Sequence, residues 1–275
     1  MIAIPFSVRV PLRWLRYTFI TALAVFGLAA CANAGTPLFM QVEGTGETTI
    51  VFISGNGNDS SVWADITPPV RALGVRTAVY DRAGLGKSAL SAKPYHIEDE
   101  AAALLKTLHA NGINGPIVLV AHSYGGLIAA LAARENTAVK GMVFVDALLP
   151  ADLSDDVVAG VLAAYSPRFA ALEAAAPALA AAIIPVVKAY PETARTMQTV
   201  TIAEDLPFID ITAETTWLTA PADVAHVRKI HRDFVAQSAA RSSVFAAGSS
   251  HNVMGDRPKL VVDAVTEMVE HVLRD

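Results

Sequence analysis

In the first half of the chain, short apolar runs alternate with longer segments that carry apolar residues at helical spacing. The runs lie at 49–53, 76–80, 117–121 and 141–145, and they are rich in β-branched residues. Strands that are buried on both faces have this pattern. Residues 97–109 place their apolar positions on one helical face and end at a helix-stopping Asn-Gly pair. This order predicts a mostly parallel sheet with helices on both faces.

A second pattern occupies residues 150–205, which are alanine-rich, helical in spacing and without strand-like alternation. We expect prolines to divide this segment, at positions 150, 167, 177, 185 and 191. Strand-like runs return at 207–212 and 243–247, and helical patterns lie at about 221–238 and 258–273. The sequence therefore predicts an α/β core formed by 35–149 and 206–275, with 150–205 as an inserted helical cap. We place the cap over the carboxyl edge of the sheet, where ligands bind in such folds.

Residues 1–34 have the pattern of a secretory signal: arginines without acids up to Arg16, an apolar core at 17–30, and Ala32-Asn33-Ala34 as a cleavage site. The apolar core is shorter than the roughly 20 residues that span a membrane. Cys31 is the only cysteine, and Leu28-Ala29-Ala30-Cys31 resembles the bacterial lipobox, whose cysteine is lipidated. We expect an exported protein, either a lipoprotein anchored at Cys31 or a free periplasmic or secreted protein.

Charge and motif content narrow the set of partners. Loss of residues 1–34 would remove three of the 21 basic residues and none of the 26 acidic ones, which leaves a formal charge of −8. No basic block remains, which argues against nucleic acid or anionic lipid as a partner. Gly86-Lys87-Ser88 ends like a phosphate loop, but Asp81 stands where that motif needs glycine. Neither a nucleotide cofactor nor a metal-ligand cluster is expected.

The stretch 116–126 is the most informative one, because an apolar run ends there abruptly at Ala-His-Ser-Tyr-Gly-Gly and a helix-favouring segment follows. A strand, a sharp turn with serine at its apex and a helix form a nucleophile elbow. Ala121 and Gly125 flank Ser123 with the small residues that such a turn requires. An N-cap serine is the ordinary alternative. Two glycines in a first helical turn cost about 2 kcal/mol of helix propensity, and this cost favours the elbow.

A serine needs a general base to become a good nucleophile, and the chain contains seven histidines. His122 adjoins the serine, and we expect it to point elsewhere. His251 follows the run 243–247 through a Gly-Ser-Ser turn, which places it in a loop at the same sheet edge as Ser123. His251 is therefore the candidate base. The other five lie in or beside helical patterns: His96, His109, His226, His231 and His271.

Four segments in this order resemble the α/β-hydrolase superfamily: Ser54-Gly55-Asn56-Gly57, Tyr80 to Ser88, Ala121 to Gly126, and Gly248 to His251 with Asp256-Arg257-Pro258 after it. The resemblance covers about residues 37–275. It implies Ser123 as nucleophile and His251 as general base. It also implies an oxyanion hole formed by the amides of Tyr124 and Asn56, although Ser54 replaces the histidine usual in the family.

The acid of the triad has two candidates. Members of the superfamily usually carry it after the strand that corresponds to 207–212, where Glu214 is the nearest carboxylate. Some members carry it one strand earlier, and Asp146 lies there, at the end of the run 141–145. We favour Asp146, with Glu214 as the alternative; in that case Asp146 would cap its strand.

These residues predict a serine hydrolase that cleaves a small-molecule ester through an acyl-enzyme on Ser123. Carbon–carbon bond hydrolysis, acyl transfer and cofactor-free haloperoxidase activity use the same machinery and stay open. A non-catalytic binding protein and a lipid-anchored scaffold with this fold are the alternatives from other classes. The cap contains no motif that identifies the substrate.

Overall fold

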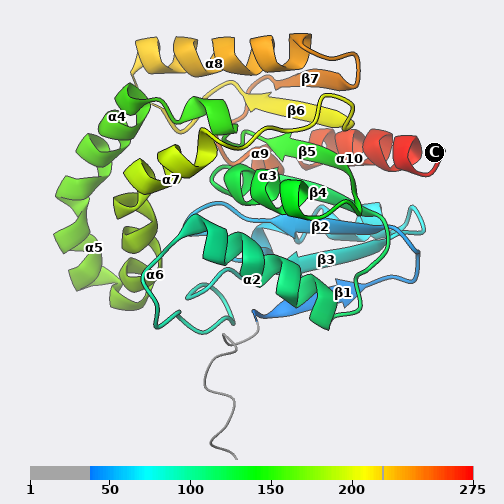
Figure 1. Cartoon of the computed structure of the whole chain (residues 1–275), viewed down its shortest axis with the longest axis horizontal. Coiled ribbons are helices and arrows are strands. Elements are labelled where there is room, and N and C mark those ends of the chain that lie inside the picture. The colour runs from blue at the N-terminus through cyan, green and yellow to red at the C-terminus, as the bar shows by residue number, and fades with distance from the viewer. Residues whose placement is uncertain (1–37, 219, 275) are drawn as a thin grey trace, which may run out of the picture. The chain divides into compact units, whose positions relative to one another are not determined.

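The computed structural model describes residues 38–218 and 220–274. The predicted signal sequence, with Cys31, lies outside the described residues. Within the described residues, seven strands form one sheet in the order β1-β3-β2-β4-β5-β6-β7 (Figure 1). β1 (Met40–Glu43) is antiparallel to β3, and the other neighbouring strands are parallel. The prediction of a mostly parallel sheet is confirmed.

The parallel strands are buried from both sides. In β4, Ile117 and Leu119 pack against one layer of helices, and Val118 and Val120 pack against the other. Two-sided burial is the reason that these segments are apolar at successive positions. The parallel strands are β2 (Thr49–Ile53), β3 (Arg76–Tyr80), β4 (Ile117–His122), β5 (Val139–Val145), β6 (Phe208–Ala213) and β7 (Arg241–Ala246).

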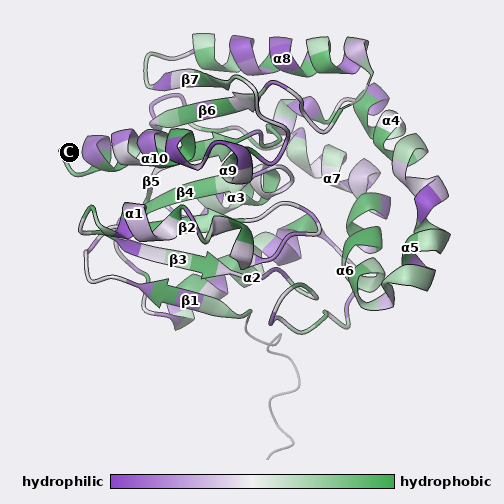
Figure 2. Cartoon of the chain, turned by 180° about the vertical axis from the view of Figure 1, so that it is seen from behind, coloured by the Kyte–Doolittle hydropathy of each residue, from purple (hydrophilic) through white to green (hydrophobic). Residues whose placement is uncertain are grey.

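Helices cover both faces of the sheet (Figures 1 and 2). One face packs against α2 (Ile97–Ala110), α3 (Gly125–Glu135) and α8 (Pro221–Ala236). The opposite face packs against α1 (Thr67–Arg71) and α10 (Pro258–Val272). Short helical turns at Ser60–Trp63 (η1) and Val253–Asp256 (α9) complete the core.

A helical insertion joins β5 to β6 and lies beside the carboxyl ends of the strands (Figure 1). Ala182 and Ile183, both in α6, lie against Gly84 and Gly57 in the loops that follow β3 and β2. The helical cap is thus observed at the expected sheet edge. Its elements are η2 (Pro150–Asp152), α4 (Asp155–Tyr165), η3 (Ser166–Arg168), α5 (Phe169–Ala175), α6 (Pro177–Lys188) and α7 (Tyr190–Met197).

Two details differ from the sequence reading. Pro185 lies inside α6 rather than at a boundary, so only the other four prolines stand in the first turn of a helix or 3₁₀ turn. The edge strand β1 was not predicted, because it has only four residues and its burial alternates. Within the described residues, one helical stretch, Asp155–Ala175, has the length and apolar composition of a helix that could cross a membrane. It consists of α4 and α5 with the 3₁₀ turn η3 between them.

Candidate active site

Ser123 stands between β4 and α3 with φ +55°, a left-handed conformation that is uncommon for any residue except glycine. The neighbouring glycines allow the tight turn. A Cβ at Gly125 would lie 2.6 Å from the carbonyl oxygen of Ile53, and a Cβ at Gly126 would lie 2.4 Å from that of Leu148. The two glycines that disfavour a helix start are therefore needed where α3 meets the ends of β2 and β5.

Ser123, His251 and Asp146 form a hydrogen-bonded chain. His251 Nε2 lies 3.0 Å from Ser123 Oγ, and His251 Nδ1 donates to Asp146 Oδ2 at 2.6 Å. The side chain of Asp146 is 8% exposed and that of His251 is 27% exposed. His251 is thus open to solvent on one side, while its carboxylate partner is shielded from competing water.

Asp146 is held by β6 and by the segment that follows β6. Its Oδ1 accepts from the Ala213 amide at 3.0 Å, and its Oδ2 accepts from Thr216 Oγ1 at 2.9 Å. Its own φ is +43°, so the ends of β4 and β5 both carry a residue other than glycine in a left-handed conformation. The sequence reading missed Thr216, because a threonine in a Glu-Thr-Thr-Trp segment carries no local signal.

Glu214, the alternative acid, does not contact His251. Its Oε2 accepts from the Gly248 amide at 2.7 Å and so supports the turn that precedes the histidine. Arg228 donates to the Glu214 carbonyl oxygen at 2.7 Å. The geometry therefore favours Asp146 over Glu214 as the partner of His251.

The two amides expected to form the oxyanion hole belong to Tyr124, the N-cap of α3, and to Asn56, in the loop after β2. Among the described residues, neither amide donates a hydrogen bond to a protein acceptor. Ser54, which replaces the usual histidine, is buried; its Oγ accepts from Trp63 Nε1 at 3.0 Å and donates to the Asp59 carbonyl. The serine thus fixes the loop through η1, and both amides are free to bind an anion.

The model of the alpha/beta hydrolase family matches residues 50–264. The chain belongs to this family. It is 35% identical over 109 residues to the uncharacterized protein YqjL of Bacillus subtilis, across 39% of this chain and 42% of that protein. It is 32% identical over 102 residues to methylesterase 9 of Arabidopsis thaliana, across 36% and 40% of the two chains. These matches span less than half the length of either relative.

A thermophilic esterase from Thermogutta terrifontis superposes on this alpha/beta hydrolase with a TM-score of 0.57 and 18% identity, over 86% of this chain and 93% of that one. This likeness shows the shared fold. The family assignment also explains why a strained serine turn, a late histidine and a helical insertion occur in one chain.

His122 is a residue of this alpha/beta hydrolase whose contacts the sequence reading did not foresee. Its Nε2 donates to the carbonyl oxygen of His251 at 3.0 Å, and the centroids of the two rings are 4.5 Å apart. Burial, together with the neighbouring His251, lowers the pKa of His122 to about 3. The ring is therefore neutral at physiological pH.

The side chain of Tyr124 enters a buried polar network beneath the cap. Its hydroxyl lies 2.7 Å from that of Tyr95, which donates to Glu100 at 2.6 Å. Arg82 forms a buried ion pair with Glu100: its Nε donates to Oε1 at 2.5 Å and its Nη2 donates to Oε2 at 3.1 Å. Thr193 in α7 lies 3.4 Å from the Tyr124 hydroxyl. The network thereby joins the residue after the serine to the loop that follows β3 and to the cap.

The loop that resembles a phosphate loop is folded around a carboxylate. Asp81 accepts from the amides of Ser60 and Lys87 at 2.8 Å and 2.7 Å. A Cβ at Gly86, where φ is +51°, would lie 2.2 Å from Asp81 Oδ2. Within the described part of the chain, no group of three or more histidine, cysteine, aspartate or glutamate side chains could hold a metal ion.

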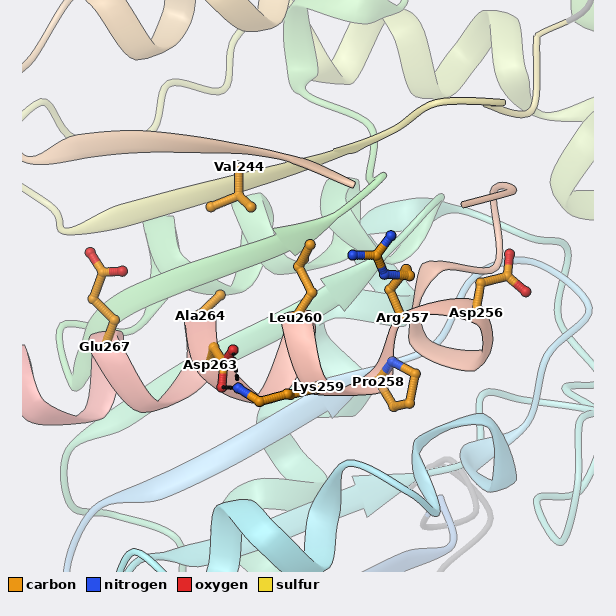
Figure 3. A pocket seen from close by; sticks show the side chains of 9 residues that line it. All are labelled: Val244, Asp256, Arg257, Pro258, Lys259, Leu260, Asp263, Ala264 and Glu267. Carbon is orange, nitrogen blue, oxygen red and sulfur yellow. Dashed lines mark hydrogen bonds and ion pairs between the residues drawn. The ribbon is translucent and has the colours of Figure 1, made fainter. Parts of the chain in front are cut away.

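A surface groove of about 560 Å³ lies between β7 and α10 (Figure 3). It contains neither Ser123 nor His251. Val244, Leu260 and Ala264 form its apolar floor, and Lys259 pairs with Asp263 at its rim. Asp256, at one end, accepts from the Ser250 amide at 2.8 Å. This hydrogen bond connects the groove to the loop that carries His251.

Proposed function

We propose that this alpha/beta hydrolase cleaves carboxylic esters through an acyl-enzyme on Ser123. The observation that carries the proposal is the chain from Ser123 Oγ through His251 to the shielded carboxylate of Asp146, next to two free amides. The name of one relative, methylesterase 9, also favours an ester as substrate.

Each residue has a defined task in this reaction. His251 takes the proton of Ser123 as the oxygen attacks the carbonyl carbon, and Asp146 stabilises the resulting imidazolium. The Tyr124 and Asn56 amides bind the oxyanion of the tetrahedral intermediate. His251 then returns the proton to the departing alcohol. Water repeats the sequence on the acyl-enzyme, which releases the acid and restores the serine.

Hydrolysis of p-nitrophenyl esters of graded chain length tests the proposal. We expect Ser123→Ala to lower kcat by a factor on the order of 10⁴–10⁶. Ser243→Ala is the matched control, because Ser243 is an exposed serine on β7. A phosphonate ester should label Ser123 stoichiometrically, as read by peptide mass spectrometry. Equal ester hydrolysis by wild type and Ser123→Ala would refute the proposal.

The alternatives in the same fold are separable by substrate. Cleavage of a diketone but not of esters would indicate a carbon–carbon hydrolase, and transfer to an added alcohol in preference to water would indicate an acyltransferase. Halide-dependent oxidation with peroxide would indicate a haloperoxidase. If the wild-type protein showed none of these activities but bound a small-molecule ligand, it would be a binding protein.

We further propose that the protein is exported, on the basis of the signal pattern in residues 1–34. Expression of the full chain in a Gram-negative bacterium and mass analysis of the mature N-terminus test this. An acylated Cys31 indicates a lipoprotein, and a free Gly35 indicates cleavage after Ala34. Retention of Met1 and of residues 1–34 in the cytosol would contradict export.

A further inference from the structure

We infer that His122 is a positioning residue that holds the main chain of His251 in place relative to Ser123 and packs against the oxyanion loop. The inference rests on the proposed serine-hydrolase function. His122 and Ser123 are consecutive, so the end of β4 places both the nucleophile and the side chain that contacts the base.

The hydrogen bond to His251 determines the tautomer of His122. The acceptor is the main-chain carbonyl oxygen of His251, 3.0 Å from Nε2. A carbonyl only accepts, so Nε2 carries the hydrogen of the neutral ring and Nδ1 carries a lone pair. No described residue forms a hydrogen bond with this buried Nδ1. His122 therefore has one donor, and it is used on the loop of the base.

The opposite side of His122 faces the oxyanion loop. A Cβ at Gly55 would lie 2.8 Å from Ser123 Cβ and 2.9 Å from His122 Nδ1. The backbone next to Asn56 thus packs directly against the serine and against the imidazole of His122. A shift of the His122 ring would disturb the base and the oxyanion loop together.

The arrangement requires that the imidazole ring of His122 be neutral. When His251 accepts the serine proton, a positive charge forms on a ring whose centroid is 4.5 Å from that of His122. A second cation at this distance would oppose that charge, whereas a neutral ring does not. Burial lowers the pKa of His122 to about 3, so its ring is neutral at physiological pH.

The other hydrogen bonds of the histidine loop come from different elements. Glu214 and Thr215 bind the backbone at Gly248 and Ser249, and Asp256 binds Ser250. Among the described residues, His122 supplies the hydrogen bond from β4 to the main chain of this loop. Without it, the loop keeps its main-chain bonds to the segment after β6 and to α9, and the side chain of His251 keeps its bonds to Ser123 and Asp146, but the main chain of His251 loses its bond to β4.

Three variants of His122 test the inference, because they change whether the side chain carries a hydrogen-bond donor and where that donor lies. Gln places its side-chain nitrogen at about the position of the imidazole Nε2, Asn places its nitrogen nearer Nδ1, and Leu has no donor. We expect His122→Leu and His122→Asn to lower kcat about 10- to 100-fold, the size of effect that a small misplacement of catalytic groups produces. KM should change less than threefold, and His122→Gln should recover most of kcat.

The control separates loss of positioning from loss of stability. Val118→Ala removes buried volume from the same strand, four residues before His122, and it should lower Tm without lowering kcat. All variants are titrated with the phosphonate so that kcat refers to active sites. If His122→Leu does not fold, the pair His122→Asn and His122→Gln decides the question by itself.

Three results would overturn the inference: unchanged kcat in His122→Asn and His122→Leu, equal impairment of His122→Gln and His122→Asn, or an equal fall of kcat in Val118→Ala, which would attribute the effect to lost stability. Failure of the proposed function is distinguishable, because the wild type itself would then show neither ester turnover nor labelling of Ser123.

Discussion

Two histidines of this alpha/beta hydrolase are paired with aspartates, and they show what separates a candidate base from a structural cation. His251 binds Asp146 through Nδ1 and leaves Nε2 to Ser123. His231 in α8 binds Asp210 through Nδ1 at 2.8 Å and Asp152 through Nε2 at 3.0 Å. Both nitrogens of His231 therefore face carboxylates, whereas His251 has one nitrogen for a reaction.

The surroundings of the two rings differ as much as their partners. The side chain of His251 is 27% exposed and that of His231 is 6% exposed. Burial by itself would lower the pKa of His231, but the charges and hydrogen bonds of Asp210 and Asp152 outweigh burial and hold its pKa well above the ordinary value. His231 is thus a buried cation with both donors occupied, and it has no free nitrogen with which to accept a proton.

The second cluster joins three parts of the fold. Asp210 lies in β6, His231 in α8 and Asp152 in η2, where the cap begins. Asp152 also accepts from the Leu149 amide at 2.7 Å. We conclude that the His231 cluster fastens the start of the cap to the core. Of these two clusters, that of His251 leaves a ring nitrogen next to a serine, which is the arrangement that the proposed reaction requires.

The largest expected effect comes from the acid of the His251 pair. Asp146→Asn should lower kcat for ester hydrolysis about 10⁴-fold, because an amide neither fixes the reactive tautomer nor stabilises the imidazolium. Glu214→Gln is the matched control and should change kcat less than about threefold, since its contact is to the Gly248 amide. Steady-state kinetics decide between them, and a larger loss in Glu214→Gln would exchange the two assignments.

The His231 cluster should respond in stability rather than in catalysis. His231→Leu leaves two buried carboxylates without their cation, and we expect a loss of about 3–5 kcal/mol in the free energy of unfolding. The measurement is urea denaturation, with His226→Leu, a histidine of the same helix that is not buried, as the control. A kcat per folded active site below half the wild-type value would show that His231 contributes to catalysis as well as to stability.

The free energy of unfolding should also depend on pH through the protonation of His231. The folded-state pKa of His231 is raised, so its stabilising contribution is complete below the unfolded-state pKa of about 6.5. The contribution is lost as the pH rises through the folded-state value, at up to about 1.4 kcal/mol per pH unit. Unfolding free energies of wild type and His231→Leu should therefore converge at alkaline pH, and a constant difference would contradict a protonated His231.

The smallest effect is expected at Thr216. Thr216→Val keeps the shape of the side chain but removes the hydroxyl that donates to Asp146 Oδ2. One hydrogen bond to a charged group is worth about 1.5–3 kcal/mol. Because the Ala213 amide still binds Asp146, we expect a loss near the lower limit of this range, which corresponds to a fall in kcat of about tenfold. Thr215→Val is the neighbouring control. No change in Thr216→Val would mean that the Ala213 amide alone holds Asp146.

Much of the fold could be predicted from the sequence, because two-sided burial leaves apolar runs that are visible without the structure. β2, β3 and α2 were placed to within one residue of their observed ends. β1 escaped, because a four-residue edge strand has no such run. The sequence predicts a boundary at Pro185, but Pro185 lies inside α6, a helix that is apolar almost throughout (Figure 2).

The sequence by itself determined the turn at Ser123, since the close approach of strand and helix backbones demands small residues next to the serine. It also indicated His251 as the base, but it left both Asp146 and Glu214 open as the acid. Asp146 and His251 are 105 residues apart, and Ser123 and His251 are 128 apart. Which carboxylate reaches the histidine depends on which strand ends lie side by side at one edge of the sheet. The same holds for His122 and Thr216, whose roles exist only because folding places a carbonyl or a carboxylate within reach of one donor.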